Sequence, residues 1–202
     1  MKSLLTFLMV LTLSGAVFAD CPDLIELDCG GGTAWFGLRH DGADVAQGQT
    51  VTLECDAAIL GVEFKFQVTG NPNGGVPSMV AGDEIHVTVV DMDNNQIMTA
   101  TTPIPEDIWN DWISFEFPED MVVPAGEYLF AAYTTVERQC SIWFCPGEDL
   151  YEEGARMVSL GGLDGTWGAF GDGHDIPFRV HLNSGGVPVD NVSLTNIKGL
   201  FQ

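Results

Sequence analysis

Residues 160–182 read LGGLDGTWGAFGDGHDIPFRVHL, and this stretch decides the fold because it joins a turn, an acidic loop and a strand. In its last part, apolar residues alternate with Pro177, Arg179 and His181. A period of two is the pattern of a β-strand that has one face in a core and the other in water. The sequence therefore predicts a closing strand whose core face carries Ile176, Phe178, Val180 and Leu182.

The same alternation recurs upstream. Residues 60–68 give the clearest case, and residues 85–89 and 96–101 predict a hairpin around the turn at 93–95. The predicted core face of the first of these strands carries Leu60, Val62, Phe64 and Phe66. About eight to ten short strands separated by turn signals, without a helical period before the tail, indicate an all-β, two-sheet antiparallel β-sandwich of jelly-roll type.

The two ends of the chain differ from the domain between them. Residues 1–19 combine Lys2, a short apolar run and small residues at the end, which is the pattern of a secretory signal peptide. We assign 20–183 to the β-sandwich domain and 184–202 to a linker and a short amphipathic tail. The location predicted from the signal is secreted, either periplasmic or extracellular.

The charge of the chain limits its partners. The 202 residues include 7 basic and 29 acidic side chains, a net charge of −22. Removal of the signal takes away Lys2, and 6 basic minus 29 acidic residues then gives −23. Such a charge excludes nucleic acid and anionic lipid as partners. The apolar run in the signal is too short to span a bilayer and no second run follows, so no membrane span is predicted.

Five cysteines in an exported chain suggest disulfides, with at least one thiol left over. Strand parity allows Cys55 and Cys140 to meet in the core, in which case Cys21 and Cys29 form a second, local loop. Pairing of Cys140 with Cys145 is the competing alternative, and the sequence does not choose between them.

Several segments together resemble a known group of proteins. The segments are 48–52 leading into 59–66, then 83–91, 112–117, 124–128 and 175–180. They look like exported bacterial jelly-roll domains similar to the carbohydrate-binding-module-like domains of surface proteins. The resemblance covers about residues 45–182. It implies a β-sandwich outside the cytoplasm and supports fold and location more than function. The partner that we predict, a glycan or another cell-surface component, rests also on the outward tryptophans described below.

Acidic residues near the closing strand are candidates for a structural calcium site. Asp172 and Asp175 offer carboxylate oxygens in a Gly-rich loop that could wrap a hard cation. In jelly rolls of the group named above, a calcium ion is often held near the first and last strands, which favours Asp175. The alternative is an ordinary Asp/Gly turn without a metal.

Tryptophans are the candidate ligand-binding residues. Parity assigns Trp112 and Trp143 to the face opposite the core, and Trp109 lies just before the first of them, in a predicted loop. Tryptophan faces stack on sugar rings while neighbouring polar side chains contact the hydroxyls. These three residues could thus form a glycan platform. Alternatively, the loop at 146–154 could fold over them.

The sequence lacks the motifs of serine hydrolases, zinc peptidases and phosphate-binding loops. We therefore predict a secreted, non-catalytic binding or surface-interaction module that is not an enzyme, with a glycan as a possible ligand. A structural or assembly component of the cell envelope, which would use the tail as its contact, is the first alternative. A jelly-roll hydrolase with a pair of facing carboxylates is the second.

Overall fold

The computed structural model describes residues 22–38, 42–67, 76–106, 108–118, 121–147, 149–170 and 174–183. The predicted signal peptide and the predicted tail lie outside these ranges. So do two of the candidate site residues, Cys21 and Asp172.

The described residues form β-strands and no helix, and no helix that could cross a membrane is found among them. The prediction of an all-β protein is confirmed. The strands are β1 (Leu24–Leu27), β2 (Gly32–Leu38), β3 (Asp44–Leu53), β4 (Ala57–Gln67), β5 (Glu84–Asp91), β6 (Gln96–Pro103), β7 (Trp109–Glu116), β8 (Val122–Val123), β9 (Gly126–Tyr133), β10 (Gln139–Phe144), β11 (Arg156–Leu160), β12 (Thr166–Ala169) and β13 (Phe178–Asn183).

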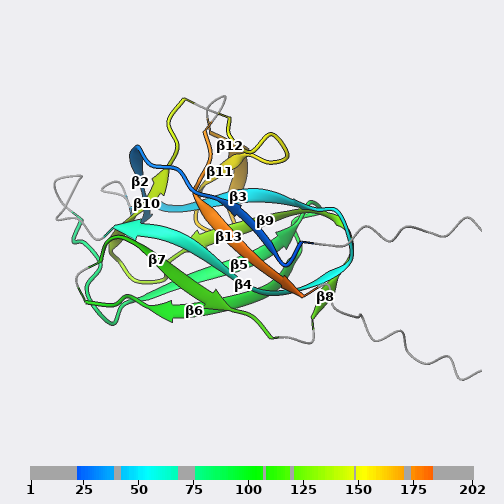
Figure 1. Ribbon diagram of the computed structural model, residues 1–202. Helices are drawn as coiled ribbons and strands as arrows, with labels where there is room; N and C mark the ends of the chain where they lie inside the picture. Colours follow the sequence, from blue (N-terminus) through cyan, green and yellow to red (C-terminus); the bar gives the residue numbers. More distant parts are fainter. Residues whose placement is uncertain are drawn as a thin grey trace, which may run out of the picture.

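Hydrogen bonds link all the strands into one antiparallel sheet rather than two separate sheets. Its main path runs β1-β13-β4-β10-β2-β3-β9-β5-β6 and is open at both ends. Strands β7 and β8 pair with the other edge of β4, while β11 pairs with β3 and carries β12. In Figure 1, β11 and β12 lie at the top of the molecule, away from β6 and β8 at the bottom.

One apolar core connects the two halves of this path. Phe64 of β4 and Phe178 of β13 come from one half, and Val87 of β5 and Phe130 of β9 come from the other. All four side chains are fully buried in the same cluster. Burial of such side chains stabilises the fold by about 1.5–3 kcal/mol each. The sheet therefore folds so that its halves share one large hydrophobic core, and Val90, Leu129 and Ala131 form a smaller, separate buried cluster.

The predicted core face of β4 is correct at three positions and wrong at one. Val62, Phe64 and Phe66 are fully buried, but Leu60 is only partly buried, and Ile59 takes its place in the core. The reason is a β-bulge, because the pairing of β4 with β13 shifts register between His181 and Leu182. An extra residue in one strand reverses the alternation beyond it.

The predicted disulfide pairings are wrong. Cys29 bonds to Cys145, with their Cα atoms 5.7 Å apart, and Cys140 is a free buried thiol. Cys55 is also disulfide-bonded. The parity argument failed because β3 ends at Leu53, so the alternation does not reach Cys55. Cys29 instead follows the end of β1, beside the end of β10 that precedes Cys145.

Two segments that were predicted to be irregular are strands. Trp109, assigned to a loop, begins β7, and the Gly-rich turn after β11 contains the short strand β12. The stretch before residue 49 also holds β1 and the first half of β3. These strands are completed by hydrogen-bonding neighbours, which the local sequence pattern does not show.

Candidate functional site

Two tryptophans share the outer face of the sheet beside β4. Trp112 pairs with Lys65 and Trp109 pairs with Gln67, so both lie opposite side chains of the same β4 face. Their spacing of three residues fits one face because the register shifts between Phe66 and Gln67. Asn110 lies at this bulge with a φ of 57°, a left-handed conformation that asparagine tolerates.

Charged groups surround Trp112. The ring centroid lies 4.2 Å from the Arg179 guanidinium carbon and 4.8 Å from Lys65 Nζ. Arg179 is in turn paired with two carboxylates, at 3.3 Å from Glu26 and 3.2 Å from Glu63. The ring and the guanidinium therefore hold each other in place through cation–π contact and ion pairs. We call this outer surface of β13, β4 and β7, from Trp109 to His181, the tryptophan face.

A hollow of about 430 Å³ continues the tryptophan face along β4. It is lined by Glu63, Ser114, Glu116 and His181, among others, and His181 Nε2 lies 3.1 Å from Glu63 Oε1. Gly61 lies at its floor, where a Cβ atom would come within 2.8 Å of the Phe115 carbonyl oxygen. The hollow thus offers hydrogen-bonding groups of both kinds on the strand segments next to the partly buried Trp112.

The three predicted ligand-binding tryptophans differ in exposure. Trp109 is 68% exposed, whereas Trp112 and Trp143 are each partly buried. Ser141 pairs with Gln67 on β4, so Trp143, two residues further along β10, lies on the same side of the sheet as Trp112. Exposed aromatic surface is therefore concentrated at Trp109.

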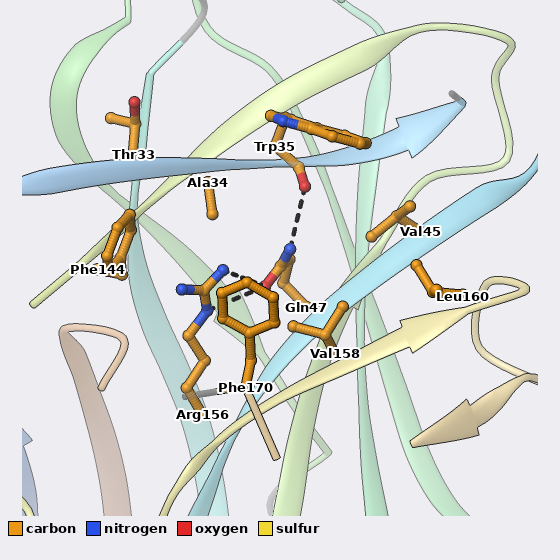
Figure 2. Close-up of a pocket in the computed structure, with 10 residues that line it drawn as sticks. All are labelled: Thr33, Ala34, Trp35, Val45, Gln47, Phe144, Arg156, Val158, Leu160 and Phe170. Carbon is orange, nitrogen blue, oxygen red and sulfur yellow. Dashed lines mark hydrogen bonds between the residues drawn. The ribbon is translucent and has the colours of Figure 1, made fainter. Parts of the chain in front are cut away.

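A second cavity, also of about 430 Å³, lies between β2, β3 and β11 (Figure 2). Its lining is mostly apolar or aromatic, and we call it the arginine pocket. The lining residues are Thr33, Ala34, Trp35, Val45, Gln47, Phe144, Arg156, Val158, Leu160 and Phe170.

Arg156 is the charged group of this pocket, and its side chain is 3% exposed. Its Nε and Nη2 donate to Gln47 Oε1 at 3.2 and 3.0 Å, while Gln47 Nε2 donates to the Trp35 carbonyl oxygen at 3.1 Å. The guanidinium carbon lies 4.6 Å from the Phe144 ring centroid and 4.5 Å from that of Phe170. The third nitrogen, Nη1, is buried without a hydrogen-bond partner. Burial lowers the pKa of Arg156 to about 10, so the guanidinium is protonated at neutral pH.

Asp175, the preferred calcium ligand, is 1% exposed and fully hydrogen-bonded. Its Oδ1 accepts from Gln49 Nε2 at 3.0 Å. Its Oδ2 accepts from the backbone N–H groups of Leu150 and Tyr151 at 2.9 and 3.0 Å. These donors anchor the loop before β11 to the segment before β13, a structural task that leaves little capacity for a cation. Within the described ranges, no group of three or more His, Cys, Asp or Glu side chains is arranged to hold a metal ion.

Sequence reasoning missed the arginine pocket. Its polar centre joins Gln47 and Arg156, 109 positions apart, and its two flanking rings come from the end of β10 and from the residue after β12. One signal was available, because Arg156, Val158 and Leu160 recur every second residue and share a strand face. An arginine on an otherwise apolar strand face indicates either a buried ion pair or a site.

No protein-family model matches the chain, and no curated protein matches it. The resemblance to carbohydrate-binding-module-like domains therefore rests on the sequence segments alone.

Proposed function

We propose that this protein is an exported, non-catalytic binding module that recognises a glycan on the tryptophan face. The observation that carries the proposal is the shared orientation of Trp109 and Trp112, which follows from the bulge at Asn110. A tryptophan that is 68% exposed beside a second indole is uncommon on a surface without a ligand. Aromatic faces of this kind stack on the apolar side of sugar rings.

The polar groups beside the indoles support a sugar rather than an apolar ligand. The Glu63 carboxylate accepts hydrogen bonds, the Ser114 hydroxyl both donates and accepts them, and the His181 ring can do either. The hollow can therefore bind sugar hydroxyl groups that donate a hydrogen bond and those that accept one. Arg179 and Lys65 fix the orientation of Trp112 before a ligand arrives. Fixing a contact in advance lowers the entropic cost of binding.

The proposal includes the fold type and the location. A jelly-roll sandwich is supported by the way the two halves of the open sheet enclose one core. Export is supported by the signal pattern at 1–19 and is compatible with the Cys29–Cys145 disulfide. The absence of nucleophile, zinc and phosphate motifs from the sequence supports a role without catalysis. We do not include a calcium ion, because N–H donors occupy both oxygens of Asp175.

A glycan array followed by titration calorimetry on the purified full-length protein tests this proposal. We expect binding to at least one oligosaccharide, and a loss of about tenfold or more in affinity for Trp109→Ala, because base or sugar stacking on one ring contributes about 1–3 kcal/mol. Phe170→Ala, which removes an exposed ring that lines the arginine pocket and not the tryptophan face, is the matched control and should bind as the parent does. Binding that is equal in Trp109→Ala and the parent, or absent for every glycan, would overturn the proposal.

A further inference from the structure

Arg156 is the exception among the cations of this acidic chain. The described residues include four lysines and arginines, and Lys65, Arg138 and Arg179 each pair with a carboxylate. Among the residues that the structure describes, Arg156 alone of these four has no carboxylate within ion-pair distance, although it is the most deeply buried. A buried charge without a partner is costly, and proteins rarely keep one without a use for it.

The neutral groups around Arg156 do not compensate its charge. Gln47 accepts two of its N–H bonds through a single amide oxygen, and Nη1 has no acceptor. Asp175, the buried acid of the segment before β13, is already used, because its oxygens accept from Gln49, Leu150 and Tyr151. The pocket therefore holds a positive charge and, just beneath its lining, a donor without an acceptor.

The apolar lining of the pocket indicates the chemistry of the rest of the ligand. Val45, Val158 and Leu160 supply an aliphatic side, and the rings of Phe144 and Phe170 flank the guanidinium, as Figure 2 shows. At the rim, Leu160 is 64% and Phe170 is 52% exposed. Exposed apolar side chains next to a cavity indicate that an apolar group covers them when a ligand binds.

We propose that the arginine pocket binds an organic acid, whose carboxylate contacts Arg156 and whose apolar body lies along β11 between Val158 and Leu160. One free nitrogen fits a monoanionic carboxylate better than a phosphate, which needs several donors. Nη1 is out of contact with solvent in the ligand-free pocket. Contact with Nη1 therefore requires a lining side chain to move, and the proposal assigns this movement to the half-exposed Phe170 ring.

The test compares hexanoate with hexanamide, which has the same length and no charge, by calorimetry and by saturation-transfer NMR on the full-length protein. A charge-assisted hydrogen bond predicts that hexanoate binds about tenfold tighter or more than hexanamide. Arg156→Met should remove this preference. Trp109→Ala, which alters the tryptophan face only, should leave hexanoate binding unchanged, so the result is independent of glycan recognition.

A pair of rim variants keeps the test decisive if Arg156→Met folds poorly. Leu160→Asp and Leu160→Lys change an exposed residue at the pocket mouth to opposite charges and leave Arg156 intact. We expect hexanoate to bind about threefold more weakly to the Asp variant and about threefold more tightly to the Lys variant at low salt.

Two outcomes overturn the proposal. The first is equal binding of hexanoate and hexanamide, or binding of neither. The second is binding of inorganic phosphate or sulfate as tightly as hexanoate with the same dependence on Arg156, which would identify a simple anion site without an apolar subsite.

Discussion

Two arginines of this protein lie against aromatic rings, yet their surroundings are opposite. Arg179 lies over Trp112 on the outer face, is partly exposed and pairs with Glu26 and Glu63. Arg156 lies between Phe144 and Phe170, is buried, and has only the amide oxygen of Gln47 as an acceptor. In a chain with 29 acidic residues, the pairing of Arg179 is expected. The isolation of Arg156 is the feature that calls for a ligand.

The largest effect is expected for Asp175, the one acidic side chain that is buried among the residues the structure describes. Asp175→Ala removes an acceptor from the buried Gln49 amide and from the partly buried N–H groups of Leu150 and Tyr151, and it should lower the free energy of unfolding by about 3 kcal/mol. Asp28→Ala is the matched control, because it removes an exposed carboxylate paired with Lys65 and should cost less than about 1 kcal/mol. Urea denaturation measures both. If the two variants lose the same stability, Asp175 is not the anchor described above.

Loss of the Cys29–Cys145 disulfide should have the next largest effect on stability, and this bond is adjacent to both the tryptophan face and the arginine pocket. Asp28, next to Cys29, pairs with Lys65 on the tryptophan face, while Phe144, next to Cys145, lines the arginine pocket. Replacing Cys29 and Cys145 by serine should lower the free energy of unfolding by about 2–4 kcal/mol, because the unfolded chain regains the freedom of a long loop. Thermal and urea unfolding measure the loss. Hexanoate and glycan affinities should both fall in this variant, and a fall in only one of them would show that the bond supports a single region.

Replacing the buried Arg156 together with its acceptor should cost less stability than replacing the partly exposed Arg179, although buried residues usually contribute more. Arg179→Met removes two partly exposed ion pairs and one cation–π contact, with an expected loss of about 1 kcal/mol. The double variant Arg156→Met with Gln47→Met replaces a desolvated charge and its acceptor by apolar groups, and it should be at least as stable as the parent. Chemical denaturation without added ligand measures both. A loss of more than about 2 kcal/mol in the double variant would mean that Arg156 is held for stability rather than for binding.

The smallest effect is a dependence on pH that belongs to neither arginine. Burial lowers the pKa of His86 below its usual 6.5, with Glu84 opposing the shift. The folded state thus takes up a proton less readily than the unfolded state. Stability is complete above pH 6.5 and falls as the pH drops from there through the lower, folded-state pKa.

His86→Gln should therefore flatten the change in unfolding free energy between pH 7.5 and 5.5, measured by urea titrations at each pH. Arg156 remains protonated throughout this range, so its comparison with Arg179 is unaffected. An unchanged slope in His86→Gln would show that the pH dependence does not come from His86.

The sequence predicts more of the fold than of the sites, for reasons that particular residues illustrate. Val62, Phe64 and Phe66 follow the period of two and are buried, because alternation along a strand is a local property. Leu60 departs from it because a bulge is set by pairing with β13, which local sequence does not encode. Cys29 and Cys145 could not be paired in advance, since their meeting depends on where β1 and β10 end.

Only part of the candidate site could be predicted from the sequence. The outward orientation of Trp112 follows from parity, but the contribution of Trp109 depends on the bulge at Asn110. The contact of Arg156 with Gln47 joins positions more than a hundred residues apart, through the pairing of β11 with β3. Long-range pairing of this kind is what single-sequence patterns leave open.

Cys140, a free thiol among the five cysteines, is buried and therefore unreactive in the folded protein. The thiol is 3% exposed on β10, opposite Phe36, and burial raises its pKa to about 12. Since the thiolate is the form that attacks disulfides, a folded molecule keeps this sulfur chemically silent in an oxidising environment. Scrambled bonds can then arise only from chains that have not yet closed the core. Because the folded molecule is already protected, the yield of correctly bonded protein depends on how quickly β10 is buried during folding.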